Sequence, residues 1–191
     1  MKIDELKDKA LWLRQELWDM VMRQRKGHIP SSYSCVEIIV ALYYGGVARV
    51  IKGQPEASNR DRVVVSKGHA AMVQYPILAD FDFFDKLELE HFTQPGGLLG
   101  MYADFSIPGI EGVSGSLGHG LGMGSGFALA AKKDGANYRT FVVLGDGECY
   151  EGSCRQCFRA APRKSNRKSP VDLIGGPFKN PAGNPMGIPV G

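Results

Sequence analysis

The sequence predicts an α/β fold with a largely parallel sheet flanked by helices. Two short apolar segments, residues 62–66 and 139–144, have the β-branched and aromatic composition of buried strands. Helical patterns precede and separate them, and this alternation is typical of parallel sheets. The chain has 191 residues, of which 43% are hydrophobic and 23% charged. These values are ordinary for a globular domain, and they exclude a chain that is disordered throughout.

Three helices are expected in the first 80 residues. The first covers residues 3 to about 25, because its apolar residues recur every three or four positions. These residues are Leu6, Ala10, Leu13, Leu17 and Val21. Ser34 and Glu37 have the S-x-x-E spacing of a capping box, which predicts a second helix to about Tyr44. The third helix is expected after the first strand, from Lys67 to about Leu78.

A glycine-rich helix is expected between the two strands. Residues 91–116 are mostly loop, and the helical pattern then runs over 117–133. Glycine occupies positions 118, 120, 122, 124 and 126. A glycine inside a helix costs about 1 kcal/mol relative to alanine. We therefore expect another helix or a ligand to approach this segment closely.

The charge of the chain changes sharply near Ser153. Residues 154–191 carry seven basic residues and one acidic residue, whereas the rest carries 16 basic and 19 acidic residues. Six of the eleven prolines also lie in the last 38 residues. We therefore expect a domain over residues 1–153 and a divergent tail over 154–191. Our hypothesis is that this tail is an out-of-frame or otherwise replaced end.

The sequence shows neither a secretory signal nor an apolar segment long enough to span a membrane. The charged N-terminus has no apolar segment after it, and the longest nearly apolar run, Ile38–Ala48, is shorter than the about 20 residues that span a bilayer. We expect a cytoplasmic protein with reduced cysteines and no membrane partner. Cys154 and Cys157 form a C-x-x-C, which we interpret as accidental because no second pair completes a zinc site. The basic tail has few aromatic residues, so no nucleic-acid partner is expected.

One short motif follows the second predicted strand directly. Gly145-Asp146-Gly147 lies where parallel sheets bind ligands, beyond the carboxyl ends of their strands. The aspartate could hold a hard divalent cation, and the glycines would let backbone N–H groups approach phosphate oxygens. The motif alone is also compatible with an ordinary turn at the end of a strand.

Three histidines are candidates for a functional site. His28 lies in a glycine-flanked loop ahead of a helix and could transfer protons near neutral pH, or could be an ordinary surface histidine. His69 follows the first strand through a glycine, where functional loops gather. His119 lies among small residues and could face a ligand or the interior.

Taken together, five segments resemble a known family. They are GHIPSSYS at 27–34, SKGHA at 66–70, PGIE at 108–111, GSLGHG at 115–120 and GDGECYEG at 145–152. In this order they resemble the N-terminal, diphosphate-binding half of transketolase, most like the short N-terminal subunit of the split bacterial form. The resemblance covers about residues 1–153.

The resemblance implies a fold, a reaction and partners. The fold would be the thiamine-diphosphate-binding fold, here in truncated form. The reaction would transfer a two-carbon ketol unit from a ketose phosphate to an aldose phosphate, with thiamine diphosphate and Mg²⁺, for which Ca²⁺ or Mn²⁺ could substitute. A C-terminal transketolase subunit would supply the glutamate that activates the cofactor, in a homo- or hetero-oligomer. The alternatives are a related thiamine diphosphate enzyme with another donor or acceptor, and a truncated fragment without catalytic activity.

The resemblance also assigns roles to residues. Asp146 would bind the metal, and Glu151 would belong to an acidic network near the subunit interface. His28 and His69 would be catalytic, with His119 a weaker candidate. The cofactor would be bound by His69, Gly115, Ser116, Leu117, Gly147 and Glu148.

Two departures from the family pattern affect these expectations. The family often has a Gly-His-Pro loop before the PGIE segment, whereas this chain has Gly100-Met101-Tyr102, so the donor sugar could differ. The family also has a metal-binding asparagine some thirty residues after the G-D-G. Here Gly175 and Gly176 occupy that spacing, and the nearest asparagines are Asn166 and Asn180. We therefore expect the metal and cofactor to bind weakly or not at all.

Overall fold

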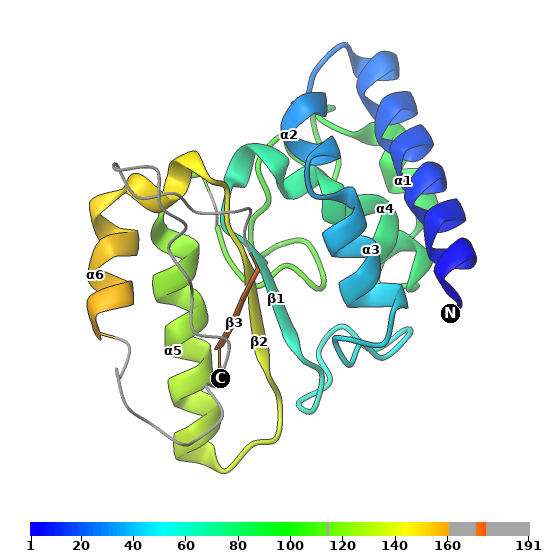
Figure 1. Ribbon diagram of the computed structural model, residues 1–191. Coiled ribbons are helices and arrows are strands. Elements are labelled where there is room, and N and C mark those ends of the chain that lie inside the picture. The colour runs from blue at the N-terminus through cyan, green and yellow to red at the C-terminus, as the bar shows by residue number, and fades with distance from the viewer. Residues whose placement is uncertain (114, 161–170, 175–191) are drawn as a thin grey trace.

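In the described part of the chain, the fold is built on a three-stranded parallel sheet with strand order β1-β2-β3 (Figure 1). The computed structural model describes residues 1–113, 115–160 and 171–174. Strand β1 is Arg62–Val65, β2 is Thr140–Val143 and β3 is Val171–Ile174. The register pairs Val65 with Val143, so β1 and β2 end side by side at their carboxyl ends. The predicted parallel α/β architecture is confirmed.

Helices cover both faces of the sheet. Figure 1 shows α1, α3 and α4 on one side and α5 and α6 on the other. The α-helices are α1 Ile3–Gln24, α2 Ile29–Tyr33, α3 Val36–Tyr44, α4 Tyr75–Asp80, α5 His119–Asp134 and α6 Gly152–Ala160. These elements are connected by the 3₁₀ helices η1 Gly68–Gln74, η2 Lys86–His91 and η3 Gly147–Tyr150.

The strands separate two apolar clusters because successive strand residues point to opposite faces. Val63 and Val65 join the larger cluster with the buried residues of α1, α3 and α4. Val64 and Val142 join a smaller cluster with Leu121 of α5. This two-sided burial explains why both predicted strands are continuous apolar runs rather than alternating ones.

The first helix is confirmed almost to the residue, but the capping box is not formed. The predicted pair separates because Ser34 donates to the carbonyl of Ser31 at 2.8 Å, while Glu37 pairs with Arg14 at 2.6 Å. Helix α3 instead begins at Val36 after Cys35, without a side-chain cap.

The expected helix from Lys67 to Leu78 is divided in two. The 3₁₀ helix η1 is followed by α4, which begins at Tyr75 with Pro76 in its first turn. Proline has no backbone N–H and fits only at the start of a helix, so it marks a new start here.

The glycines of α5 let the helix lie directly on the sheet. A Cβ at Gly124 would lie 2.3 Å from Cγ2 of Val142, and one at Gly120 would lie 2.4 Å from Oγ of Ser66. Neither distance is compatible with a side chain. The close neighbour that the glycine pattern predicted is therefore the sheet at Gly120 and Gly124. At Gly118 it is helix α6, because a Cβ there would lie 2.4 Å from Oγ of Ser153.

Part of the predicted divergent tail has regular structure. Helix α6 packs against α5, and β3 pairs in parallel with β2. Pro162, which we expect to interrupt the helix that the family has here, lies outside the described residues, as do Asn166, Gly175, Gly176 and Asn180. Among the helices that are described, none is long and apolar enough to cross a membrane.

Candidate active site

The two motifs singled out from the sequence meet at one edge of the sheet. Ser66-Lys67-Gly68-His69 follows β1, and Gly145-Asp146-Gly147 follows β2. Because β1 and β2 are neighbours in parallel register, their following loops lie together. This is the edge at which open parallel sheets bind ligands.

Glu148 joins the loops of this edge to one another. Its side chain is 3% exposed. One carboxylate oxygen accepts hydrogen bonds from the hydroxyl of Ser66 and from the backbone N–H of Gly118 at 2.7 Å, and the other accepts from the N–H of Gly145 at 3.0 Å. Ser66 in turn accepts from the N–H of Gly120 at 3.1 Å. The carboxylate therefore fixes the ends of β1 and β2 and the start of α5.

Lys67 places a positive charge behind the same edge. It is 7% exposed, and its ammonium donates to the carbonyl of Ser31 at 2.9 Å and to the hydroxyl of Ser34 at 2.7 Å. No carboxylate among the described residues forms an ion pair with Lys67, so its charge is not neutralised by a neighbour there. A buried cation without a carboxylate partner is costly, and a bound anion would offset that cost.

His28 and His69 lie together although 41 positions separate them in the chain. The centroids of their rings are 6.1 Å apart, and the ring planes are nearly perpendicular. The centroid of the Tyr102 ring lies 6.4 Å from that of the His28 ring. Nε2 of His28 is buried and has no hydrogen-bond partner within the described ranges. This unpaired nitrogen could accept or donate a proton when a ligand is bound.

The electrostatic environment favours a neutral His69. Burial is the main cause that lowers the pKa of His69, and the charges of Lys67 and His28 act in the same direction. Glu148 opposes them more weakly. His69 is therefore expected to be an unprotonated imidazole at neutral pH, able to accept a hydrogen bond or a proton.

Most of the other predicted residues present exposed atoms near this edge. Asp146, Gly147, Gly115, Ser116, His119 and Glu151 are exposed, and Leu117 is half-buried. Apart from the neighbours in the chain, no atom of the described residues lies within 4 Å of where a Cβ of Gly147 or Gly115 would be, so the described part of the structure leaves space for a ligand there. Across the ranges described, no three His, Cys, Asp or Glu side chains group as a metal site. Asp146 is thus a single side-chain donor.

The cysteines near the edge are poorly suited to nucleophilic chemistry. All four cysteines are free thiols. Burial raises the pKa of Cys149 to about 12 and that of Cys154 to about 11, so both are protonated at neutral pH. Cys149 donates to the carbonyl of Gly145 at 3.2 Å. Cys149 packs in the smaller apolar cluster, and its thiol holds the G-D-G turn through this hydrogen bond.

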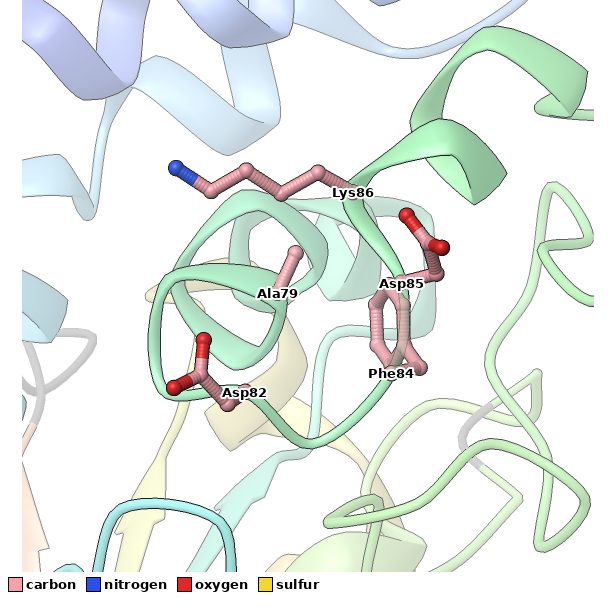
Figure 2. A pocket seen from close by; sticks show the side chains of 5 residues that line it. All are labelled: Ala79, Asp82, Phe84, Asp85 and Lys86. Carbon is pink, nitrogen blue, oxygen red and sulfur yellow. The ribbon is translucent and has the colours of Figure 1, made fainter.

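Two surface hollows lie elsewhere. The larger, about 530 Å³, is lined at the end of α4 by Ala79, Asp82, Phe84, Asp85 and Lys86, as Figure 2 shows. Asp82 and Lys86 are paired with Lys52 and Asp80 respectively. The smaller, about 240 Å³, includes Arg62 at the amino end of β1. Neither hollow contains a residue that the sequence predicted as functional.

Two residues at the edge were not assigned a role from the sequence. Lys67 belongs to the SKGH segment, and its position directly after an apolar strand was the available signal. Tyr102 was noted only as part of an altered loop, and no local pattern indicates its contact with His28.

The sequence matches the family described as transketolase, thiamine diphosphate binding domain, over residues 7–165. The match extends past residue 153, where we expected the resemblance to end. The chain is 37% identical over 153 residues to an apulose-4-phosphate transketolase subunit of Phocaeicola vulgatus, an alignment that covers 80% of this chain and 54% of that protein. It is 32% identical to the 6-deoxy-6-sulfo-D-fructose transketolase subunit SqwG of Clostridium sp., covering 78% of this chain and 54% of that protein.

Comparison of the structure with solved structures also finds transketolases. The crystal structure of transketolase from Campylobacter jejuni superimposes with a TM-score of 0.76 at 30% identity, covering 84% of this chain and 26% of that one. The thiamine diphosphate fold that the five segments implied is therefore confirmed, in incomplete form. The chain spans about half the length of the two subunits that it matches.

Proposed function

The chain belongs to the transketolase family, in its thiamine diphosphate binding domain, and from this premise we propose that it is the N-terminal subunit of a transketolase. The observation that carries the proposal is the joining of the SKGH and G-D-G segments by Glu148 at one sheet edge. Two-carbon ketol transfer between a ketose phosphate and an aldose phosphate is the reaction that we assign.

The residues of this edge fit a diphosphate. The open backbone of Gly147 would donate its N–H to phosphate oxygens, with Lys67 and His69 as the nearby cationic and polar side chains. Glu148 would act indirectly, because its carboxylate already accepts hydrogen bonds from within the chain. Gly115, Ser116 and Leu117 would line the aminopyrimidine side of the cofactor. When bound, thiamine diphosphate supplies the electron sink for carbanion chemistry.

Asp146 would hold the metal ion. Mg²⁺ is commonly held by one or two carboxylates together with phosphate oxygens and water, so a single exposed aspartate beside a diphosphate suffices for part of its shell. Ca²⁺ or Mn²⁺ could replace it.

The histidines would handle the protons of the substrate. His28 has an unpaired Nε2, and it would exchange a proton with a hydroxyl or carbonyl oxygen of the ketose. His69, whose pKa is lowered, would act as a neutral hydrogen-bonding group next to it. His119 is exposed at the start of α5 and is a weaker candidate for the same function.

A partner subunit belongs to the proposal. The relatives from Phocaeicola vulgatus and Clostridium sp. are named as subunits, which supports a C-terminal partner that completes the site. Exposed Glu151 would take part in the acidic contacts with that partner. We place the assembly in the cytoplasm, as a homo- or hetero-oligomer acting on sugar phosphates.

Two alternatives depend on specific observations. The altered loop at Met101 and Tyr102 favours a related enzyme of the same cofactor class with another donor or acceptor. The sheet of three strands in the described residues favours a truncated fragment that associates without catalysing.

The test is a transfer assay with the protein co-expressed with a C-terminal transketolase subunit. We expect ketol transfer from fructose 6-phosphate to an aldose phosphate, abolished in Asp146→Ala and retained in Asp134→Ala, an exposed aspartate at the far end of α5. Transfer only from donors that are not sugar phosphates would establish the first alternative. A pair that binds its partner but transfers nothing from any donor would establish the second.

A further inference from the structure

Glu111 joins the loop that precedes α5 to the start of β1. It belongs to the PGIE segment, and its side chain is 8% exposed. One carboxylate oxygen lies 2.6 Å from Nη1 of Arg60, and the other lies 3.8 Å from Nε of Arg62. Breaking a buried ion pair is costly, because the remaining charge is left uncompensated. The two arginines therefore hold this part of the loop at a defined place.

Arg60 is itself fixed by the segment that leads into β1. Its side chain is 4% exposed, and its guanidinium donates to the carbonyl of Pro55 at 2.8 Å and to that of Asp61 at 3.1 Å. The guanidinium also lies over the ring of Phe83, 5.8 Å from the centroid. The positive charge that meets Glu111 thus cannot follow a moving loop.

The loop packs closely against the fold on both sides of Glu111. A Cβ at Gly109 would lie 2.4 Å from Cδ2 of Phe83, and one at Gly112 would lie 2.8 Å from Sδ of Met123 in α5. Both distances are shorter than ordinary van der Waals contacts, so the backbone lies directly on its neighbours. The ion pair therefore clamps the middle of a closely packed segment.

The clamped segment leads to residues that we propose for cofactor binding. Residues 115–117 begin four positions after Glu111. Directly after them, the N–H of Gly118 donates to the carboxylate of Glu148 at 2.7 Å. Glu111 and Glu148 thus hold the chain on either side of the part that would line the aminopyrimidine ring. A short segment that is ordered before its ligand arrives binds that ligand more tightly.

We propose that Glu111 is a positioning residue for cofactor binding: its ion pair with Arg60 keeps residues 115–117 in the conformation that receives the aminopyrimidine ring of thiamine diphosphate. The inference rests on the proposed function, because it needs thiamine diphosphate bound at this edge. It adds that Glu111 acts through the loop and touches no ligand. The diphosphate, which the loops after β1 and β2 would bind, does not depend on Glu111.

The experiment compares two probes by calorimetry in the protein assembled with its C-terminal partner. Thiamine diphosphate and inorganic pyrophosphate are each titrated, with Mg²⁺, into wild type and Glu111→Ala. We expect the Kd for thiamine diphosphate to rise about 10-fold in the variant, because the loop must then be ordered on binding. The Kd for pyrophosphate should stay within about twofold of the wild-type value.

Two further variants complete this comparison. Glu56→Ala is the matched control, because Glu56 is exposed and lines the same smaller hollow as Glu111, and it should change neither Kd. If Glu111→Ala does not fold, Glu111→Gln serves instead, because it keeps the size of the side chain and removes only the charge. We then expect the Kd for thiamine diphosphate alone to rise about 5-fold.

A second measurement tests the clamp itself in the full chain without partner or cofactor. The N–H of Ile110 donates to the carbonyl of Ile107 at 3.0 Å, so its hydrogen exchange should be faster in Glu111→Ala. The N–H of Gly118, which Glu148 holds, should exchange as in wild type. An unchanged exchange rate at Ile110 would contradict the clamp.

The binding outcomes separate this inference from the proposed function. Equal losses of affinity for thiamine diphosphate and pyrophosphate would overturn the inference, since a general loss of site structure weakens both. Unchanged affinities in Glu111→Ala, with a wild type that binds both probes, would also overturn it and leave the proposed function intact. A wild-type assembly that binds neither probe would overturn the proposed function, and the inference with it.

Discussion

Removal of the Glu148 carboxylate should destabilise the protein more than any other single change at the candidate site. The carboxylate is buried and accepts hydrogen bonds from the hydroxyl of Ser66 and from the N–H groups of Gly118 and Gly145. Glu148→Ala leaves these three donors without their acceptor, and each buried unsatisfied donor costs about 1–3 kcal/mol. Because some of them can reach water or rotate, we expect a total loss of about 3–5 kcal/mol. This is a large part of a typical stability of about 5–15 kcal/mol.

The assay is urea unfolding followed by circular dichroism, with the midpoint and slope fitted together. Glu151→Ala is the matched control, because this glutamate is exposed and follows three residues later. We expect it to change stability by less than about 0.5 kcal/mol. If Glu148→Ala does not fold, Glu148→Gln serves instead: its amide oxygen can still accept from Ser66 and Gly118, which leaves only the Gly145 N–H unpaired, at about 1–3 kcal/mol. A loss below about 1 kcal/mol in Glu148→Ala would refute the assigned role of the carboxylate.

Two further predictions concern α5 and the charge at the site. Gly124→Ala should lower the free energy of unfolding by about 1–3 kcal/mol, because its Cβ would overlap Val142. Gly126→Ala, where a Cβ would meet no described atom within 4 Å, should instead raise it by up to about 1 kcal/mol through helix propensity. Equal effects of the two variants in urea unfolding would contradict the packing of α5 on β2. The pKa of His69, measured by NMR titration, should lie below its ordinary value of about 6.5 and should rise, while remaining below that value, in Lys67→Met, because burial is the larger cause. Because the pKa of His69 is lower in the folded than in the unfolded chain, the stability that depends on His69 is present above about pH 6.5 and is lost as the pH falls through the folded pKa. A measured pKa of His69 above about 6.5 would contradict the buried, positively charged surroundings assigned to it.

The strands and the first helix could be predicted because their signals are local. A run such as Val63-Val64-Val65 has few alternatives to a buried strand, and the spacing of Leu13 and Leu17 indicates one apolar helix face. The position of Gly145-Asp146-Gly147 directly after an apolar strand also predicted which sheet edge would carry the candidate site. Each of these signals lies within a few residues of chain.

The remainder depends on contacts between distant residues. The Ser34–Glu37 capping box was wrong because Glu37 pairs with Arg14, 23 positions away in α1, which leaves Ser34 bonded to the carbonyl of nearby Ser31. Glu148 holds Ser66, which is 82 positions away, and no local pattern shows that its carboxylate is thereby occupied within the chain. The contact of Tyr102 with His28 likewise joins residues far apart in the chain. The sequence therefore predicted a set of residues for the candidate site, but it did not show which of them hold the others in place.

The central claim is that the edge formed by the ends of β1 and β2 binds a diphosphate cofactor with a metal ion at Asp146. The most direct measurement is calorimetric titration of thiamine diphosphate, with and without Mg²⁺, into the protein assembled with its C-terminal partner. We predict a saturable isotherm with one cofactor per site that requires Mg²⁺, is lost in Asp146→Ala and is retained in Asp134→Ala. Absence of binding by the assembled wild type, or equal binding by Asp146→Ala, would contradict the claim.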